Sequence, residues 1–325
     1  MKKIAFFKIG ALGDVLMTTP LVRQVRKAHP EAKMDYLVGR SCAAILEGNL
    51  HLDNVIAFNE KTLYERKVTQ LGSILKLLRG YDVVFVLDKH WIFGLLAFCA
   101  RIPIRIGFFR RRWERVFYTQ KVSYHNVEHE INYYLKLGKT CGLPIDFLDV
   151  SLELPESKPY FVEQPYTVLI NGGGSNAYEQ SVVRRMPSQL FAELVQTCQT
   201  DGLVVFLGAR DEWTEYEKFA TERTINLCGE TSLQEVWCVL HHAQAVFSTD
   251  TGLMHMAGAV NANVTAIFGP SHPLRKCPPG AQWVWTDEEI YNGNYELYGE
   301  IPNRKYFQKM SVDKIMALRC SLQPM

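Results

Sequence analysis

The chain has 325 residues, enough for two domains that each bury a hydrophobic core, and its composition is ordinary for a soluble globular protein. The longest apolar run, residues 91–100, is too short to span a bilayer, and the Met-Lys-Lys start has no signal-peptide hydrophobic core. The eight cysteines include no C-x-x-C pair, which argues against a zinc site and a disulfide framework. We therefore expect a cytoplasmic protein.

The net charge of +2 conceals a difference between the two halves of the chain. Residues 1–160 carry 24 Lys and Arg against 16 Asp and Glu, a net charge of +8, whereas the remainder carries 12 against 18, a net charge of −6. A basic first half indicates that this half meets a polyanionic partner.

The first half alternates between strand and helix patterns. Strands are predicted at residues 3–9, 34–38, 55–58 and 83–87, and helical patterns occur at 42–47, 65–79 and 126–142. Residues 10–14 form the turn into the first helix, which ends near Ala28. Pro20 leaves two descriptions open: a kinked helix that begins at Asp14, or a helix capped by Thr19 with Pro20 as its first residue. This alternation predicts a parallel sheet.

A proline-rich linker separates the halves, with prolines at positions 155, 159 and 165. The second half repeats the alternation, with strands at 166–171, 203–207, 245–249 and 264–268 and helices at 188–200, 211–222, 232–242 and 312–320. We divide the chain into domains at residues 1–158 and 159–325. Two α/β doubly wound domains are expected to bind ligands in the cleft between them, beyond the carboxyl ends of their strands.

Four polar turns directly follow predicted strands, at residues 10–14, 172–175, 208–212 and 250–252. The turn Asp250-Thr-Gly252 places small hydrogen-bonding residues where the first N–H groups of a helix point, which favours phosphate binding. His255 follows one turn inside that helix. Ordinary helix capping is the alternative explanation of these residues.

The turn Gly172-Gly-Gly-Ser175 allows backbone N–H groups to approach a diphosphate, for which Arg184 and Arg185 supply countercharge. A glycine-rich hinge is the alternative. The turn matches neither G-x-x-x-x-G-K-[ST] nor G-x-G-x-x-G, and residue 40 is arginine where an NAD enzyme prefers an acid. Neither a P-loop nor a dinucleotide site is predicted.

Asp14 follows the first strand, where its carboxylate can take a proton from an attacking hydroxyl. As an N-cap, its alternative role, the carboxylate would be stabilised by about 0.3 to 1 kcal/mol, which weakens it as a base. Metal chemistry is not predicted, because the sequence lacks D-x-D, H-E-x-x-H and clustered Cys/His spacings.

The sharpest local charge feature is an arginine-rich stretch interleaved with aromatic residues. Its arginines are Arg101, Arg105, Arg110, Arg111, Arg112 and Arg115, and its aromatic residues are Phe108, Phe109, Trp113, Phe117 and Tyr118. Bidentate arginine contacts and interfacial rings favour phosphorylated glycolipid headgroups or a membrane surface. A solvated basic face is the alternative, and no nucleic-acid-binding module is evident.

Two motifs together resemble those of a known family. They are KIGALGDVLMTTP at residues 8–20 and STDTGLMH at residues 248–255, the latter followed by FGP at residues 268–270. They strongly resemble glycosyltransferase family 9, the lipopolysaccharide heptosyltransferases. The resemblance implies a GT-B fold with an N-terminal acceptor domain and a C-terminal ADP-heptose domain. It also implies inverting, metal-independent transfer from ADP-L-glycero-D-manno-heptose to the lipopolysaccharide inner core, without a cofactor and at the cytoplasmic face of the inner membrane.

The resemblance also implies roles for single residues. Asp14 matches the family's proposed general base. The expected donor-binding residues are Gly173, Gly174, Ser175, Arg184, Glu212, Thr231, Asp250, Thr251, Gly252 and His255. Arg184 stands where the family usually has a lysine, and Asp211 is an alternative to Glu212 as the ribose-binding acid. The expected acceptor-binding residues are Lys61, Arg110, Arg111 and Arg112, with Arg66 and Lys67 as further candidates.

In the implied mechanism, Asp14 deprotonates an acceptor hydroxyl, which attacks the anomeric carbon as ADP leaves. Arg184, Ser175 and the helix N-terminus at residues 250–252 would stabilise the leaving group. Three alternatives remain: a family 9 transferase that uses another nucleotide sugar, a sugar-nucleotide epimerase of GT-B fold, and a non-catalytic membrane-associated scaffold. The epimerase needs no basic acceptor surface, and the scaffold needs no Asp14.

Overall fold

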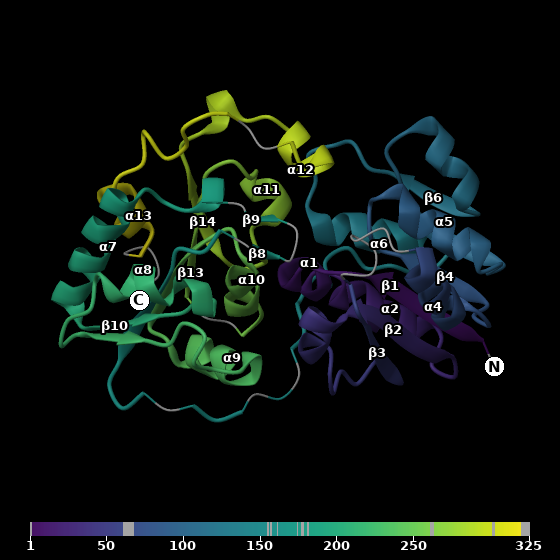
Figure 1. Cartoon of the computed structure of the whole chain (residues 1–325), viewed down its shortest axis with the longest axis horizontal. Coiled ribbons are helices and arrows are strands. Elements are labelled where there is room, and N and C mark those ends of the chain that lie inside the picture. Colours follow the sequence, from purple (N-terminus) through teal and green to yellow (C-terminus); the bar gives the residue numbers. More distant parts are fainter. Residues whose placement is uncertain are drawn as a thin grey trace. The chain divides into compact units, whose positions relative to one another are not determined.

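The computed structural model describes residues 2–60, 68–154, 156, 158–160, 162–173, 175–176, 179–180, 182–260, 263–300 and 303–319. The chain forms two compact units, Met1–Pro155 and Glu156–Met325, and each is described by itself. The sequence-based division after residue 158 lies close to this boundary. Figure 1 shows the elements of both units.

The first unit is built on a six-stranded parallel sheet in the order β3-β2-β1-β4-β5-β6. Its strands are β1 (Lys3–Lys8), β2 (Lys33–Gly39), β3 (Asn54–Phe58), β4 (Val83–Val86), β5 (Ile104–Phe109) and β6 (Gln120–Ser123). The α-helices are α1 (Leu12–Leu16), α2 (Thr19–Ala28), α4 (Val68–Leu78), α5 (Trp91–Cys99) and α6 (Glu130–Thr140), and the 3₁₀ helices are η1 (Arg40–Ile45) and η2 (Arg112–Phe117).

The second unit has a parallel sheet in the order β11-β10-β7-β12-β13-β14 and a short antiparallel pair, β8 (Ser175–Asn176) and β9 (Glu179–Gln180). The parallel strands are β7 (Tyr166–Ile170), β10 (Leu203–Phe206), β11 (Thr224–Asn226), β12 (Ala245–Thr249), β13 (Val264–Phe268) and β14 (Gln282–Trp285). Its α-helices are α7 (Ser188–Asp201), α8 (Trp213–Glu217), α9 (Leu233–His242), α10 (Gly252–Ala259), α11 (Pro273–Lys276), α12 (Asn294–Tyr298) and α13 (Val312–Arg319), and its 3₁₀ helices are η3 (Val182–Arg184), η4 (Arg210–Glu212) and η5 (Glu288–Ile290).

The two parallel sheets have the same topology. In each sheet, the first three strands run outward in one direction and the last three run outward in the other, which is the 3-2-1-4-5-6 order of a doubly wound fold. The order reverses between β1 and β4 in the first unit and between β7 and β12 in the second. These two positions are the switch points at which doubly wound sheets bind ligands.

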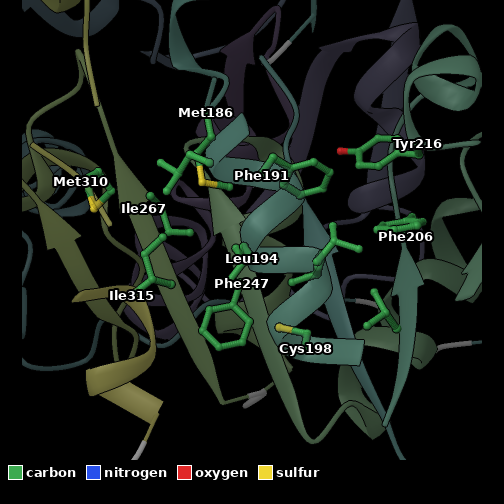
Figure 2. Close-up of a cluster of buried hydrophobic side chains, with 14 of the residues drawn as sticks. Met186, Phe191, Leu194, Cys198, Phe206, Tyr216, Phe247, Ile267, Met310 and Ile315 are labelled. Carbon is green, nitrogen blue, oxygen red and sulfur yellow. The ribbon is translucent and has the colours of Figure 1, made fainter. Parts of the chain in front are cut away.

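The central strands of the second unit are buried on both faces. Ile267 of β13 packs in a cluster with Phe191 and Leu194 of α7 and Ile315 of α13 (Figure 2). Phe268, its neighbour along the strand, belongs to a separate cluster. A strand covered on both faces is apolar at consecutive positions rather than at alternate ones, which explains the continuous apolar runs of the sequence.

The structure decides between the two descriptions of the first helical segment: there are two helices. α1 begins at Leu12 with Ala11 as its N-cap, so Asp14 lies in the first turn and its interpretation as an N-cap is wrong. α2 begins at Thr19, with Thr18 as N-cap and Pro20 in its first turn, where the missing proline N–H would have no intrahelical acceptor.

Several other differences from the sequence prediction concern short elements. The helix expected at residues 211–222 is shorter, because η4 ends at Glu212 and α8, which follows it, ends at Glu217. Strand β5 lies within the arginine-rich stretch and β6 follows it, and neither strand was predicted. The edge strands β11 and β14 were also missed, because they are short and only partly buried.

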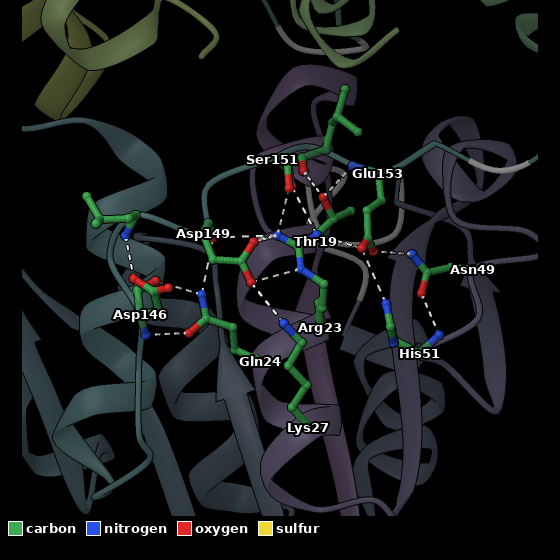
Figure 3. Close-up of polar contacts among 12 residues, drawn as sticks. Thr19, Arg23, Gln24, Lys27, Asn49, His51, Asp146, Asp149, Ser151 and Glu153 are labelled. Atoms are coloured by element: carbon green, nitrogen blue, oxygen red, sulfur yellow. Dashed lines mark hydrogen bonds and ion pairs between the residues drawn. The ribbon is translucent and has the colours of Figure 1, made fainter. Parts of the chain in front are cut away.

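A polar network attaches the end of the first unit to α2 (Figure 3). Arg23 donates to Asp149 Oδ1 at 2.6 Å and to Glu153 Oε1 at 2.5 Å. Gln24 exchanges two hydrogen bonds with the backbone of Asp146, each 2.8 Å long. These contacts span more than 120 residues of sequence, so they hold the segment before the linker on the first unit.

Candidate functional site

Each unit places charged side chains at the switch point of its sheet. In the first unit we define the carboxylate cluster as Lys8, Asp14 and Asp88, which lie just at or beyond the ends of β1 and β4. In the second unit we define the arginine cluster as Arg184, Asp250, Ser271 and Tyr295, with Asp250 directly after β12. Each cluster belongs to its own unit.

Lys8 lies at the centre of the carboxylate cluster. Its side chain is 1% exposed, and its Nζ lies 3.0 Å from Asp88 Oδ1 and 3.7 Å from Asp14 Oδ2. The other Asp88 oxygen accepts the backbone N–H of Ile9 at 2.6 Å. Burial lowers the pKa of Lys8, but the charges of Asp88, Tyr134 and Asp14 more than offset this, so the net pKa is raised and the ammonium stays charged. Asp14, with 27% of its side chain exposed, therefore lies next to a buried cation.

A second ion pair adjoins the carboxylate cluster. Lys89 follows Asp88 and lies 2.8 Å from the fully buried Glu130 Oε2, and it donates to Tyr134 Oη at 3.0 Å. The Tyr124 hydroxyl donates to the other Glu130 oxygen. Sequence reasoning missed the roles of Lys8, Asp88, Lys89 and Glu130. The available signal was a charged residue at the end of an apolar strand pattern, as at Lys8 and Asp88.

In the arginine cluster, a buried carboxylate orients a guanidinium. Asp250 is 4% exposed, accepts a hydrogen bond from the Ser271 hydroxyl, and lies 3.7 Å from Arg184 Nη1. Arg184 Nε donates to the Tyr295 hydroxyl at 2.6 Å. Burial raises the pKa of Asp250, but the charges of Arg184 and Lys276 and the bond from Ser271 outweigh it, so the pKa lies below its usual value. Asp250 therefore remains ionised and fixes Arg184.

The turn after Asp250 adjoins Glu212 across the sheet end. Thr251 is the N-cap of α10 and accepts the N–H of Met254 at 3.4 Å. A Cβ at Gly172 would lie 3.0 Å from Thr251 Cγ2 and 3.4 Å from Glu212 Oε1, so this glycine marks a close approach of the two side chains. Glycine here leaves the backbone accessible beside both of them.

Glu212 is held by an arginine and by backbone N–H groups. Its Oε1 lies 2.8 Å from Arg185 Nη2, its Oε2 accepts the N–H of Ala209 at 2.9 Å, and the backbone of Gly173 also bonds to it. Burial raises the pKa of Glu212, and the Ala209 N–H and Arg185 only partly counter this. The two arginines thus face different acids, Arg184 facing Asp250 and Arg185 facing Glu212.

The remaining predicted donor-binding residues either lie in the same unit as Asp250 and Glu212 or fall outside the described residues. Gly252 is the first residue of α10, and His255 is 3% exposed within that helix. Thr231 is half-buried directly before the N-cap of α9. Gly174 and the side chain of Ser175 lie outside the described residues.

The predicted acceptor residues lie near η2. The N–H groups of Arg110 and Arg111 both point to Glu114 Oε2, at 2.6 and 3.2 Å, so the buried Glu114 fixes the backbone of this stretch. Arg111 and Arg112 are exposed. Lys61, Arg66 and Lys67 lie outside the described residues.

The same stretch forms an exposed apolar surface with a basic border. Phe98 of α5 is 49% exposed, and Trp113 and Val116 of η2 are 46% and 65% exposed. The ring of Phe117 links them, with centroids 6.2 Å from Phe98 and 6.0 Å from Trp113. We call Phe98, Trp113, Val116 and Phe117 the aromatic surface. It is bordered in sequence by the six arginines described above.

No three or more His, Cys, Asp or Glu side chains in the described part of the chain are grouped as metal ligands. No helix within the same residues is both long and apolar enough to cross a membrane.

Two doubly wound units of this topology define the class of the protein, the two-domain fold of GT-B glycosyltransferases. The chain belongs to glycosyltransferase family 9, since the family profile described as "Glycosyltransferase family 9 (heptosyltransferase)" matches residues 71–296, more than half of the chain. The predicted family and the predicted α/β fold are thereby confirmed.

Individual relatives support this assignment. Lipopolysaccharide heptosyltransferase 3 of Escherichia coli K12 is 23% identical, over 96% of this chain and 95% of the relative. Lipopolysaccharide heptosyltransferase 2 of the same strain is 26% identical, over 81% of each chain. The structure of E. coli heptosyltransferase WaaC with ADP-2-deoxy-2-fluoro heptose shares the fold, with a TM-score of 0.72 and 17% identity over 99% of this chain and 100% of that one.

Proposed function

We propose that this protein transfers a heptose from ADP-L-glycero-D-manno-heptose to the inner core of lipopolysaccharide, with inversion at the anomeric carbon and without a metal ion. Family membership and the named activities of the relatives support heptose transfer. The observation that carries the proposal is the pairing of site types: a partly exposed carboxylate, Asp14, at one switch point, and Arg184 beside a helix N-terminus at the other.

The donor is proposed to bind at the switch point of the second unit. The Arg184 guanidinium and the first N–H groups of α10, from Gly252 onward, meet the diphosphate, because both favour an anion. Glu212 accepts hydrogen bonds from the ribose hydroxyls. The other residues in this proposed site are Gly173, Gly174, Ser175, Thr231, Asp250, Thr251 and His255. That a relative binds an ADP-heptose analogue supports this donor.

The proposed reaction is a single displacement. Asp14 accepts the proton of an acceptor sugar hydroxyl, and the hydroxyl oxygen forms a bond to the anomeric carbon from the face opposite the diphosphate. The bond between that carbon and the phosphate oxygen breaks, and its electron pair leaves with ADP. Arg184 stabilises the charge that develops on the leaving phosphate, since it is already held in place by Tyr295 and Asp250.

The acceptor is proposed to bind the first unit, which carries the basic charge of the chain. Arg110, Arg111 and Arg112, with Lys61, meet the phosphates and carboxylates of a lipopolysaccharide precursor. The aromatic surface is proposed to contact the cytoplasmic face of the inner membrane, because exposed rings bordered by arginines suit the interface of an anionic bilayer.

Product analysis tests the proposal. The protein is incubated with ADP-heptose and a panel of lipopolysaccharide precursors that carry no heptose, one heptose or two, with and without EDTA. Mass spectrometry is expected to show one heptose added to one precursor, unaffected by EDTA, and NMR is expected to show an inverted anomeric configuration. Release of free sugar without transfer would support an epimerase instead, and transfer from another nucleotide sugar alone would replace the donor.

A further inference from the structure

The buried ammonium of Lys8 contacts no position proposed for a substrate, yet a charge in the core is costly unless it is paired. Lys8 ends β1 and is 1% exposed. An apolar residue would satisfy the strand pattern better, because the preceding residues of β1 from Ile4 onward are buried and mostly apolar. The charge therefore calls for an explanation in terms of its partners.

The two carboxylates that face Lys8 differ in their distance from the ammonium and in their exposure. Asp88 is anchored twice, by Lys8 at 3.0 Å and by the Ile9 N–H at 2.6 Å, and is 8% exposed. Asp14 lies 3.7 Å from the ammonium, beyond hydrogen-bond distance, and is more exposed. Lys8 thus attracts the Asp14 carboxylate while it lies beyond hydrogen-bond distance of Asp14 Oδ2.

We propose that Lys8, anchored by Asp88, is a positioning residue that keeps Asp14 ionised and oriented for proton abstraction. This inference rests on the proposed function, in which Asp14 is the general base. The cation that faces the partly exposed Asp14 carboxylate is fixed in the core by Asp88. Lys8 itself touches neither the acceptor nor the donor.

The surroundings support this role for the ammonium. Burial raises the pKa of the Cys42 thiol to about 11 and the pKa of the Tyr134 hydroxyl well above its usual value, so both are neutral near pH 7. Lys89, the neighbouring cation, is paired with Glu130. The titratable and charged groups that act on Lys8 or Asp14 include Asp88, Lys89, Tyr134, Tyr36 and Cys42.

The test compares Lys8→Met and Lys8→Arg in the full-length protein. We expect Lys8→Met to lower kcat about 10- to 100-fold, to leave the Kd for ADP unchanged, and to move the acid limb of the kcat/KM profile to higher pH. The direction follows because losing a nearby positive charge makes protonation of a carboxylate easier. Lys8→Arg is expected to restore the acid limb, at least in part, since the charge is kept.

A matched control separates positioning from stability. Arg23→Met removes another buried cation that is shared by two carboxylates of the same unit, Asp149 and Glu153. It is expected to lower Tm and to leave the acid limb unmoved. If folded Lys8→Met has the acid limb of the wild type, with or without a lower kcat, the positioning role is overturned.

Asp14→Asn distinguishes failure of this inference from failure of the proposed function. In an Asp14→Asn background, Lys8→Met is expected to cause no further loss of kcat, because the two residues act as a unit. If Asp14→Asn alone keeps full activity, the proposed base is wrong. If Asp14→Asn is inactive while Lys8→Met matches the wild type, only the inference on Lys8 fails. Should circular dichroism show Lys8→Met to be unfolded, Asp88→Asn carries the test, and an unmoved acid limb in that variant overturns the inference.

Discussion

The two switch points share a strand order but differ in their charge. In the first unit, one buried lysine faces two carboxylates, and one of those, Asp14, reaches the surface. In the second unit, the buried carboxylate of Asp250 lies inside and the cation, Arg184, is the more exposed partner. The same topology thus presents a carboxylate at one site and a guanidinium at the other, which are the groups to which we assign the proposed base and anion-binding roles.

The difference in charge has two structural causes, the strand order and the buried partner. Parallel strand order decides where polar side chains collect, because all the carboxyl ends meet at one edge of the sheet. The sign of the buried partner then decides which charge is presented to a ligand. Loss of the exposed member at each site is therefore expected to affect different steps of the reaction.

The largest expected effect is at the first switch point. Asp14→Asn should lower kcat by about 10²- to 10⁴-fold, the usual range for loss of a general base. The Kd for ADP, measured by calorimetry, should not change. Asp53→Asn, which alters an acid of the same unit that is bonded to the Met34 N–H, is the control and should keep its activity. Weaker ADP binding in Asp14→Asn would contradict the proposal that the first unit supplies the base and only the second unit binds ADP.

A smaller effect is expected at the second switch point. Arg184→Gln should weaken ADP binding about 10- to 100-fold, since a charged hydrogen bond contributes roughly 1.5 to 3 kcal/mol. Adenosine, which has no phosphate, should bind both proteins equally. The control is Arg210→Gln, whose arginine is 75% exposed and paired with Glu230. Equal losses for adenosine and ADP would mean that Arg184 supports the fold rather than the diphosphate.

The aromatic surface should affect membrane binding and not chemistry. Trp113→Ser combined with Val116→Ser should reduce binding to phosphatidylglycerol vesicles about 10- to 100-fold, because burial of a large apolar side chain in the membrane contributes roughly 1.5 to 3 kcal/mol. Activity on a deacylated acceptor should be kept. Trp283→Ser in the second unit is a matched control, since Trp283 is 43% exposed and Trp113 is 46% exposed. Vesicle binding that both variants lose equally would contradict a specific membrane surface.

Gly208, which lies beside Glu212, allows a test of the proposed contact between Glu212 and the ribose. A Cβ at Gly208 would lie 2.5 Å from Glu212 Oε2, so Gly208→Ala should displace the carboxylate and weaken ADP binding by roughly 3- to 10-fold, as expected for loss of about one hydrogen bond. Gly72→Ala, where an added Cβ meets nothing within 4 Å, is the control and should be neutral for binding. The loss should be much smaller for 2′,3′-dideoxy-ADP, and an equal loss for both nucleotides would count against a ribose contact.

The smallest expected effect is a pH dependence. The pKa of Glu212 is raised, chiefly by burial, so its carboxylate is protonated at a higher pH than an ordinary glutamate, whose pKa is about 4.3. As pH falls, the preference for ADP over 2′,3′-dideoxy-ADP should therefore start to shrink earlier than for an exposed acid. Glu212→Gln should remove this dependence, and a pH-independent preference in the wild type would argue for another ribose-binding group.

The sequence by itself predicted the elements whose signals are local. The strand at Ala245–Thr249, the turn at residues 250–252 and the capping box from Ser232 to Glu235 all appear in the structure as predicted. Each depends on residues a few positions apart, so short-range hydrogen bonding and apolar runs determine it. The family motifs are local in the same sense.

Only the tertiary structure decided the partners of the charged residues. Lys8 and Asp88 are 80 residues apart, and Arg184 and Tyr295 are 111 apart. Such pairs leave no periodic pattern in the sequence, because the sheet order and not the spacing brings them together. For the same reason, the sequence could not show that Asp14 lies over a buried cation or that Arg184 and Arg185 face different acids. Local chemistry predicted where each turn begins, and long-range packing decided the charge that each turn presents.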